Sequence, residues 1–143
     1  MEAVLVGAVA FLAGAVPFSN LVARRSRGVD LRDVGSGTVS GTSLYSVAGF
    51  GPLALAGVCE VAKGALGPAL AGDRPLLRAI CCGLAVVGHN WSPFLRGSGG
   101  RGISPALGAF LVAAWPGAIL LGAGLGVGRL ISRTGLVCLF ASL

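Results

Sequence analysis

Long apolar runs, separated by short polar stretches, dominate the chain. Three of them, at 3–23, 47–71 and 76–95, reach the length of about 20 residues that a helix needs to cross a bilayer. Two shorter runs follow, at 105–115 and from there to about 131. The pattern therefore predicts an all-α, polytopic membrane helical bundle of five to six apolar segments.

Prolines and glycines mark the boundaries between these runs. Pro17, near the end of the first run, predicts a kink or a broken helix end. A short turn is expected at 72–75 and a break at 115–117, where the sequence reads Trp-Pro-Gly. The last apolar segment, 134–143, is too short to span a bilayer alone. We expect these segments to pack into a single membrane domain, 1–143.

The charge pattern orients the bundle. Charged residues make up only 11% of the chain and the net charge is +6, whereas a soluble domain carries about a quarter charged residues. Positive residues concentrate on the cytoplasmic side of membrane proteins. With the N-terminus outside and the loops 24–46 and 96–104 in the cytoplasm, only Arg74 and Arg78 fall outside. The arginines placed inside are Arg24, Arg25, Arg27, Arg32, Arg96, Arg101, Arg129 and Arg133.

This basic balance does not indicate nucleic-acid binding, because the arginines form no basic helical face and no stacking aromatics lie between them. Cysteine usage does not indicate a metal site either. The four cysteines all lie inside apolar runs, and their spacing fits no zinc pattern. We interpret them as small buried hydrophobic residues and expect neither a metal nor a cofactor. They are Cys59, Cys81, Cys82 and Cys138.

A polar, glycine-rich loop follows the first run, at 35–43. It is not a phosphate-binding P-loop, because no Gly-Lys-Ser/Thr follows, and it is not a dinucleotide fingerprint, because no strand precedes it. Its hydroxyls lie close to four arginines in the sequence. Two interpretations stay open, a cradle for an anion and a plain connector.

Two ionisable residues interrupt the second run. Glu60 and Lys63 lie one helical turn apart, so they can pair on one face of a helix. An ionisable residue at that depth is costly and usually faces the protein interior or a polar cavity. The pair can lock helix packing or act directly on a substrate, and the sequence does not decide between these roles.

His89, the only histidine, stands where the third run ends. Asn90 follows it, and the second glycine-rich loop, 96–104, carries Arg96 and Arg101. Glycines let backbone N–H groups converge on an anion, and arginines supply charge and forked donors. His89 can serve as a base for a hydroxyl nucleophile or as a donor to a phosphate; a purely structural histidine is the alternative.

Together these motifs resemble the PlsY family, the bacterial membrane glycerol-3-phosphate acyltransferases that use acyl phosphate as donor. The family motifs Gly-Ser-x-Pro, Gly-Ser-Gly-Asn-x-Gly-Ala-Thr-Asn, Asp-x-x-Lys-Gly, Gly-His-Asn and Lys-Gly-Gly-Lys-Gly correspond in order to residues 14–17, 35–43, 60–64, 88–90 and 98–102. The resemblance covers residues 10–110, about two thirds of the chain.

Some motif positions differ. Ser46 occupies the position of a family arginine, Thr38 and Ser43 replace two asparagines, and Ser98 replaces a loop lysine, while Arg101 keeps the charge of another lysine. The family usually continues through further spans beyond residue 130. The resemblance therefore implies a truncated or unusually short, divergent member.

The resemblance implies transfer of a fatty acyl chain from acyl phosphate to the 1-hydroxyl of sn-glycerol 3-phosphate, giving lysophosphatidic acid for phospholipid synthesis. It implies a multi-pass protein of the bacterial inner membrane, whose site faces the cytoplasm. The implied partners are glycerol 3-phosphate, acyl phosphate, membrane lipids and the soluble acyl-phosphate synthase.

The resemblance also assigns roles to residues. It gives catalysis to His89, Asn90 and Ser36, and leaves Glu60 as structural or substrate-binding. The implied substrate-binding residues are Gly35, Gly37, Thr38, Thr42, Ser43, Lys63, Gly99, Gly100, Arg101 and Gly102. Two alternatives stay open: a catalytically degenerate relative that binds phosphate or lipid head groups or regulates an active paralogue, and a small-solute transporter built around Glu60 and Lys63.

Overall fold

The computed structural model describes residues 1–130, apart from the Arg129 side chain, and confirms the predicted all-α fold. Within that range there is no strand. The helices are α1 (Glu2–Ala15), α2 (Phe18–Arg27), η1 (Leu31–Asp33), α3 (Gly41–Ala48), α4 (Phe50–Ala71), α5 (Pro75–Asn90), η2 (Pro93–Leu95), α6 (Ile103–Ala113) and α7 (Trp115–Leu130). The segment predicted at 134–143, with Arg133 and Cys138, lies outside the described residues.

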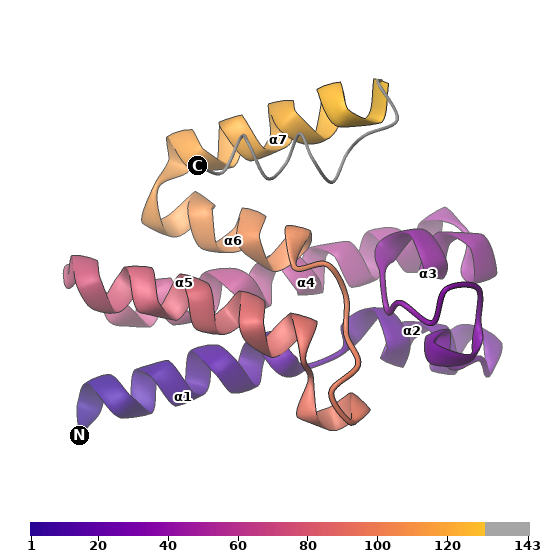
Figure 1. Cartoon of the computed structure of the whole chain (residues 1–143), viewed down its shortest axis with the longest axis horizontal. Coiled ribbons are helices and arrows are strands. Elements are labelled where there is room, and N and C mark those ends of the chain that lie inside the picture. The colour runs from indigo at the N-terminus through magenta and orange to yellow at the C-terminus, as the bar shows by residue number, and fades with distance from the viewer. Residues whose placement is uncertain (131–143) are drawn as a thin grey trace.

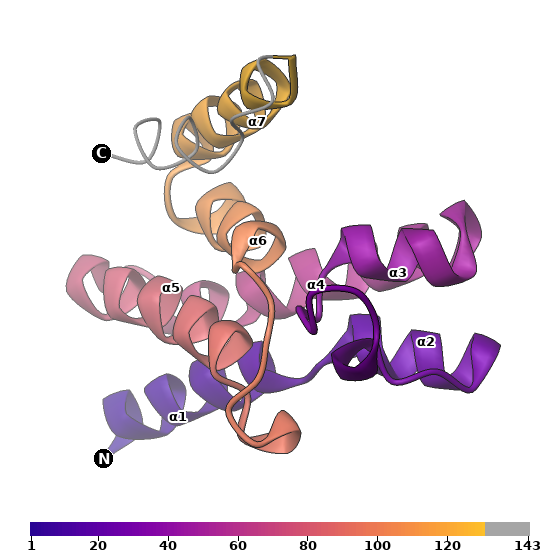
Figure 2. The same cartoon turned by 45° about the vertical axis from the view of Figure 1, so that its right-hand side comes forward.

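The helices form two regions that share α4 (Figure 1). In one, α1 packs against α4 and α5, and α6 covers α4 and carries α7 on its other side. In the other, α2 and α3 lie beside α4 beyond the end of α1 (Figure 2). Two helical stretches, Glu2–Arg27 and Phe50–Ala71, are long and apolar enough to cross a bilayer. The second region buries an apolar cluster of Ala23, Leu31, Val39, Leu44, Ala48, Ala56 and Leu95.

Glycines let the helices of the first region approach each other closely. A methyl group added to Gly14 would overlap the backbone of Ala85, and one added to Gly64 would overlap the backbone of Pro105. Small residues mark helix contacts in membranes, because lipid provides no hydrophobic drive and close van der Waals packing must replace it. These contacts fix α1 against α5 and α4 against α6.

The break predicted at Pro17 is present and divides the first run into α1 and α2. Proline has no N–H to donate, so the helix cannot continue through it unchanged. The carbonyls of Ala15 and Val16 and the first amides of α2 therefore need partners outside their own helices.

Several predicted boundaries were wrong; α2, for example, continues to Arg27, into the loop that was predicted from residue 24. Residues 41–46 were expected in a loop, yet they begin α3, because the Ser40 hydroxyl caps that helix by accepting from the Ser43 N–H at 3.2 Å. The second span was expected from 47 but begins at Phe50, since Gly49 has a φ of 80°. The third span was expected to reach residue 95 but ends at Asn90, two residues before Ser92 and Pro93 start a separate turn.

Ion pairs occupy both ends of the bundle. At the end holding the N-terminus and the α4–α5 turn, Arg74 pairs with Glu2 at 3.3 Å and Arg78 pairs with Asp73 at 3.5 Å. At the opposite end, Asp30 accepts from the side chains of Arg24 and Arg32 and from the backbone N–H of Arg32. The Asp30 cluster fixes the start of the loop at 34–40.

The ion pairs and hydrogen bonds of Asp30 make the stability of the folded protein depend on pH in the acidic range. Hydrogen bonds from the Arg32 side chain hold the pKa of Asp30 well below its usual range, although burial opposes them. The unfolded carboxyl has a pKa of about 3.9. Because the folded value is lower, the stabilisation is complete above the unfolded value and is lost as pH falls through the folded value.

We therefore expect Asp30→Asn to lower the melting temperature at pH 7 and to flatten its decline between about pH 4 and pH 2. The measurement is thermal unfolding of the purified protein in detergent. Asp33→Asn is the matched control, because Asp33 is exposed and forms no ion pair within the described chain. Equal flattening in both variants would contradict the assignment to Asp30.

Candidate functional site

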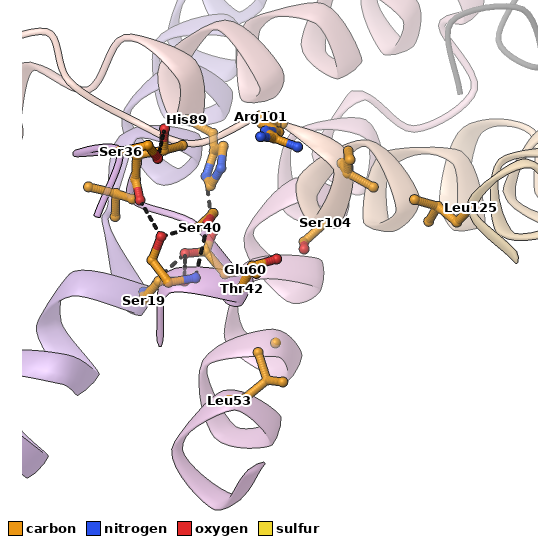
Figure 3. Close-up of a pocket in the computed structure, with 17 residues that line it drawn as sticks. Ser19, Ser36, Ser40, Thr42, Leu53, Glu60, His89, Arg101, Ser104 and Leu125 are labelled. Atoms are coloured by element: carbon orange, nitrogen blue, oxygen red, sulfur yellow. Dashed lines mark hydrogen bonds and ion pairs between the residues drawn. The ribbon is translucent and has the colours of Figure 1, made fainter. Parts of the chain in front are cut away.

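A polar cavity of about 380 Å³ opens where the two regions of the fold meet. Figure 3 shows His89 and Arg101 on one side of it, facing Glu60 and Thr42. Leu53 and Leu125 lie farther out, and they make the outer part apolar. The polar side chains that line the cavity are Ser19, Ser36, Thr38, Ser40, Thr42, Ser43, Glu60, His89, Arg101 and Ser104.

Glu60 is the centre of the hydrogen bonding. Its side chain is 4% exposed. Oε1 accepts hydrogen bonds, whereas Oε2 makes close ion-pair contacts but accepts no hydrogen bond within the described chain. The backbone N–H and the hydroxyl of Ser19 each donate to Oε1 at 3.1 Å. Oε2 lies 2.6 Å from the Lys63 ammonium and 3.1 Å from Nδ1 of His89. A carboxylate buried this deeply requires such compensation, because burial of an unpaired charge is very costly.

Lys63 contacts the backbone at the helix break in addition to its pairing with Glu60. Its ammonium donates to the Val16 carbonyl at 2.5 Å and lies 5.8 Å from the centre of the Phe18 ring. Lys63 is buried and is not among the residues that line the cavity, whereas Glu60 is. Of the two roles left open by the sequence, this geometry favours a lock between α4 and the break.

The 3.1 Å contact with Oε2 of Glu60 favours a proton on Nδ1 of His89. An ionised carboxylate only accepts hydrogen bonds, so the nitrogen that faces it is the one suited to carry the proton. In the neutral imidazole, Nε2 then carries a free lone pair. A methyl group added to Gly100 would overlap Nε2, so a glycine at this position leaves that nitrogen room. The arrangement can accept a proton at Nε2 or, once protonated, donate one there.

The two glycine-rich loops lie against each other. The Val39 N–H donates to the Gly99 carbonyl at 3.1 Å, and the Gly100 N–H donates to the His89 carbonyl at 3.2 Å. A methyl group added to Gly99 would meet the carbonyls of His89 and Asn90. These loops are separate motifs in the sequence, and the fold brings them together as one wall of the cavity.

The first glycine-rich loop lines the cavity with hydroxyl groups. Ser36 donates to Thr38 at 3.1 Å, and the Ser43 hydroxyl donates to the Thr38 carbonyl at 2.8 Å. Ser46, which stands at the position of the family arginine, donates to the Ser43 carbonyl at 2.8 Å and is exposed outside the cavity. Among the described side chains, Arg101 is the cation that lines the cavity.

The structure separates the expected site residues into two groups. Those that line the cavity are Ser36, Thr38, Thr42, Ser43, Glu60, His89, Arg101 and Gly102. Gly35, Gly37, Lys63, Asn90, Gly99 and Gly100 lie behind them or in the same loops. The Asn90 Oδ1 is buried without a hydrogen-bond partner and lies beside Gly102.

Sequence reasoning placed Ser40 among the donors of the first glycine-rich loop but missed Ser19 and Ser104 as lining residues. The signal for Ser19 was available, since it lies two residues after Pro17, in the first turn of a new helix whose N–H groups are free. Ser104 likewise lies in the first turn of a helix, α6. Both require the position of a helix start that the apolar pattern alone does not give.

Known proteins match this chain along most of its length. A family model described as glycerol-3-phosphate acyltransferase matches residues 4–141. Glycerol-3-phosphate acyltransferase 1 of Deinococcus radiodurans is 38% identical over 115 residues, which cover 78% of this chain and 58% of that protein. The enzyme of Thermus thermophilus is 40% identical over 105 residues, covering 71% of this chain and 52% of that protein. The chain spans about half the length of the curated relatives it matches.

A solved structure has the same fold. It is a crystal structure of PlsY, an integral membrane glycerol 3-phosphate acyltransferase, in its glycerol 3-phosphate form. The TM-score is 0.87 at 25% sequence identity, and the match covers 99% of this chain and 74% of that one. The arrangement of helices is therefore shared with an integral membrane protein.

The buried pair of Glu60 and Lys63 generates a stability prediction. Lys63→Met keeps the side-chain length but leaves the Glu60 carboxylate and the Val16 carbonyl without their cation. Breaking a buried pair in this way costs about 3–5 kcal/mol. We expect the double variant Glu60→Gln/Lys63→Met to lose less than the sum of the two single variants, since no uncompensated charge remains. Additive losses in detergent unfolding would show that the two side chains are not coupled.

Proposed function

This chain belongs to the glycerol-3-phosphate acyltransferase family, and we propose that it transfers a fatty acyl group from acyl phosphate to glycerol 3-phosphate, forming lysophosphatidic acid. The observation that carries this proposal is the Glu60–His89 pair, which faces a cavity walled by two glycine-rich loops and Arg101. The cavity thus combines a proton acceptor for a hydroxyl with donors for phosphate groups. The family match does not favour the non-catalytic relative.

His89 acts as the base in the proposed step. The 1-hydroxyl oxygen of glycerol 3-phosphate forms a bond to the acyl carbonyl carbon, and its proton passes to Nε2 of His89. The bond between that carbon and the bridging phosphate oxygen then breaks, and the phosphate leaves with the electron pair. Glu60 stabilises the imidazolium that forms, because its Oε2 lies 3.1 Å from Nδ1. The proton on Nε2 returns to the released phosphate.

The phosphate groups account for the hydroxyl wall and Arg101. Phosphate is a good leaving group, so the acyl carbon needs little activation and most of the catalytic effect comes from holding the two substrates in line. The hydroxyls of Ser36, Thr38 and Thr42 and the guanidinium of Arg101 are among the donors that line this space. Ser46 does not supply the charge of the family arginine, which leaves a larger share of the binding to Arg101.

We further propose that the site faces the cytoplasm of a bacterial inner membrane and receives acyl phosphate from the soluble synthase. Charge supports this orientation. At the end of the bundle that holds the cavity, Arg25, Arg27, Arg96 and Arg101 form no ion pair within the described chain, whereas Arg74 and Arg78 at the other end are both paired. Arg24 and Arg32 lie at the cavity end as well, and an excess of positive residues marks the cytoplasmic side.

The base role predicts that His89→Ala lowers kcat for acyl transfer by on the order of 10²–10⁴. His89→Gln is expected to be similarly slow, because an amide hydrogen-bonds but does not take up a proton at neutral pH. The measurement is lysophosphatidic acid formation by the purified chain in lipid. A His89→Gln variant that keeps most of the rate would show that His89 only donates a hydrogen bond.

Phosphate binding at Arg101 predicts stabilisation by glycerol 3-phosphate. The melting temperature should rise with ligand concentration as binding linkage requires, and the rise should be much smaller in Arg101→Ala. Arg96→Ala is the matched control, since Arg96 is an exposed arginine of the same loop that does not line the cavity. If chloride at equal ionic strength stabilises the protein equally, only charge screening is present.

The proposed orientation predicts the outcome of thiol labelling in intact cells. The four native cysteines are replaced, and one new cysteine is introduced at Ser26 or at Asp73, which are exposed at opposite ends of the bundle. A reagent that does not cross membranes should label Asp73→Cys from outside and leave Ser26→Cys unlabelled until the cells are opened. The reverse pattern would overturn the orientation.

A further inference from the structure

We propose that Ser19 is a positioning residue that sets the tautomer of His89 through Glu60. The inference rests on the proposed function, because it explains how the Nε2 lone pair is kept available for the acceptor hydroxyl. Ser19 belongs to none of the family motifs quoted above and was not among the site residues expected from the sequence. The structure nevertheless buries it to 4% exposure against the central carboxylate.

The two donors of Ser19 act on a single oxygen. Its N–H and its hydroxyl both reach Oε1 of Glu60 at 3.1 Å. The N–H is available because Pro17 breaks the preceding helix and Ser19 lies in the first turn of α2. Two donors on Oε1 restrict rotation of the carboxylate about its terminal bond.

Fixing Oε1 determines what Oε2 contacts. Oε2 then points toward both Lys63 and His89, at 2.6 and 3.1 Å. The Lys63 ammonium has three donors and follows the carboxylate if it turns, whereas the imidazole needs one oxygen in the plane of its ring. Without the Ser19 hydroxyl only the Ser19 N–H still holds Oε1, so the carboxylate rotates more readily toward Lys63 and away from Nδ1. A released imidazole also populates the form with its proton on Nε2, which cannot accept the proton of a hydroxyl.

The tautomer is measurable without any enzymatic assay. His89 is the only histidine in the chain, so the imidazole ¹⁵N signals of uniformly labelled protein in lipid nanodiscs belong to it alone. We expect the neutral imidazole of the wild type to carry its proton on Nδ1. Ser19→Ala should show a substantial fraction with the proton on Nε2, and Ser19→Thr, which keeps the hydroxyl, should resemble the wild type.

Ser92 provides a matched control at the same helix break. Its hydroxyl donates to the Ala15 carbonyl at 2.6 Å and it is 1% exposed, yet it forms no hydrogen bond with Glu60. Ser92→Ala therefore loses a buried hydrogen bond and some stability, but its imidazole spectrum should remain that of the wild type. A Ser19→Ala spectrum identical to the wild type, or an equal change in Ser92→Ala, would overturn the proposal.

Kinetics separate this inference from the proposed activity. In Ser19→Ala we expect kcat for acyl transfer to fall by on the order of 10-fold, because part of the population lacks the base form. The KM for glycerol 3-phosphate should stay within about two-fold, since Arg101 and the hydroxyl wall are unchanged, and Ser19→Thr should restore kcat. A wild-type chain without transferase activity would refute the proposed function, while the tautomer comparison would still test the role of Ser19.

Discussion

The site depends on which groups form hydrogen bonds with the free backbone N–H and C=O groups at the Pro17 helix break. Inside a bilayer no water is available for exposed backbone groups, so a broken helix persists only where protein groups replace the lost hydrogen bonds. Here Lys63 takes the Val16 carbonyl, Ser92 takes the Ala15 carbonyl, and Glu60 accepts the N–H of Ser19. The hydrogen bonds at this helix break therefore hold together three segments that are distant in the sequence: the break itself, α4 and the chain that follows α5.

The same contacts bring the residues of the proposed site together. The hydrogen bonds at the break place the middle of α4 next to the end of α5. Oε2 of Glu60 therefore lies 3.1 Å from Nδ1 of His89. The α5 end then leads into the loop that carries Arg101, and the backbone bond between Val39 and Gly99 brings the first glycine-rich loop alongside it. A carboxylate that would be too costly if left alone in the membrane becomes the group that orients the histidine.

Much of the fold could be predicted from the sequence, and the reasons differ between elements. Apolar runs and Pro17 sufficed for the helical class and for the break, because both depend on local composition. The start of α3 at Gly41 was missed, since a short capped helix has no apolar run of its own. The pairing of Glu60 with Lys63 follows from helical spacing, but the contact of Glu60 with His89 depends on tertiary packing. Ser19 was missed because its role comes from a free amide.

The most direct test of the proposed function is genetic rescue. A bacterial strain that lacks its acyl-phosphate-dependent glycerol-3-phosphate acyltransferase receives this chain, and growth is measured after confirming that the protein reaches the membrane. The proposal predicts growth with the wild-type chain and none with His89→Ala at equal membrane abundance. Failure of the wild-type chain to support growth, although it is present and folded in the membrane, would contradict the catalytic role assigned to the Glu60–His89 pair.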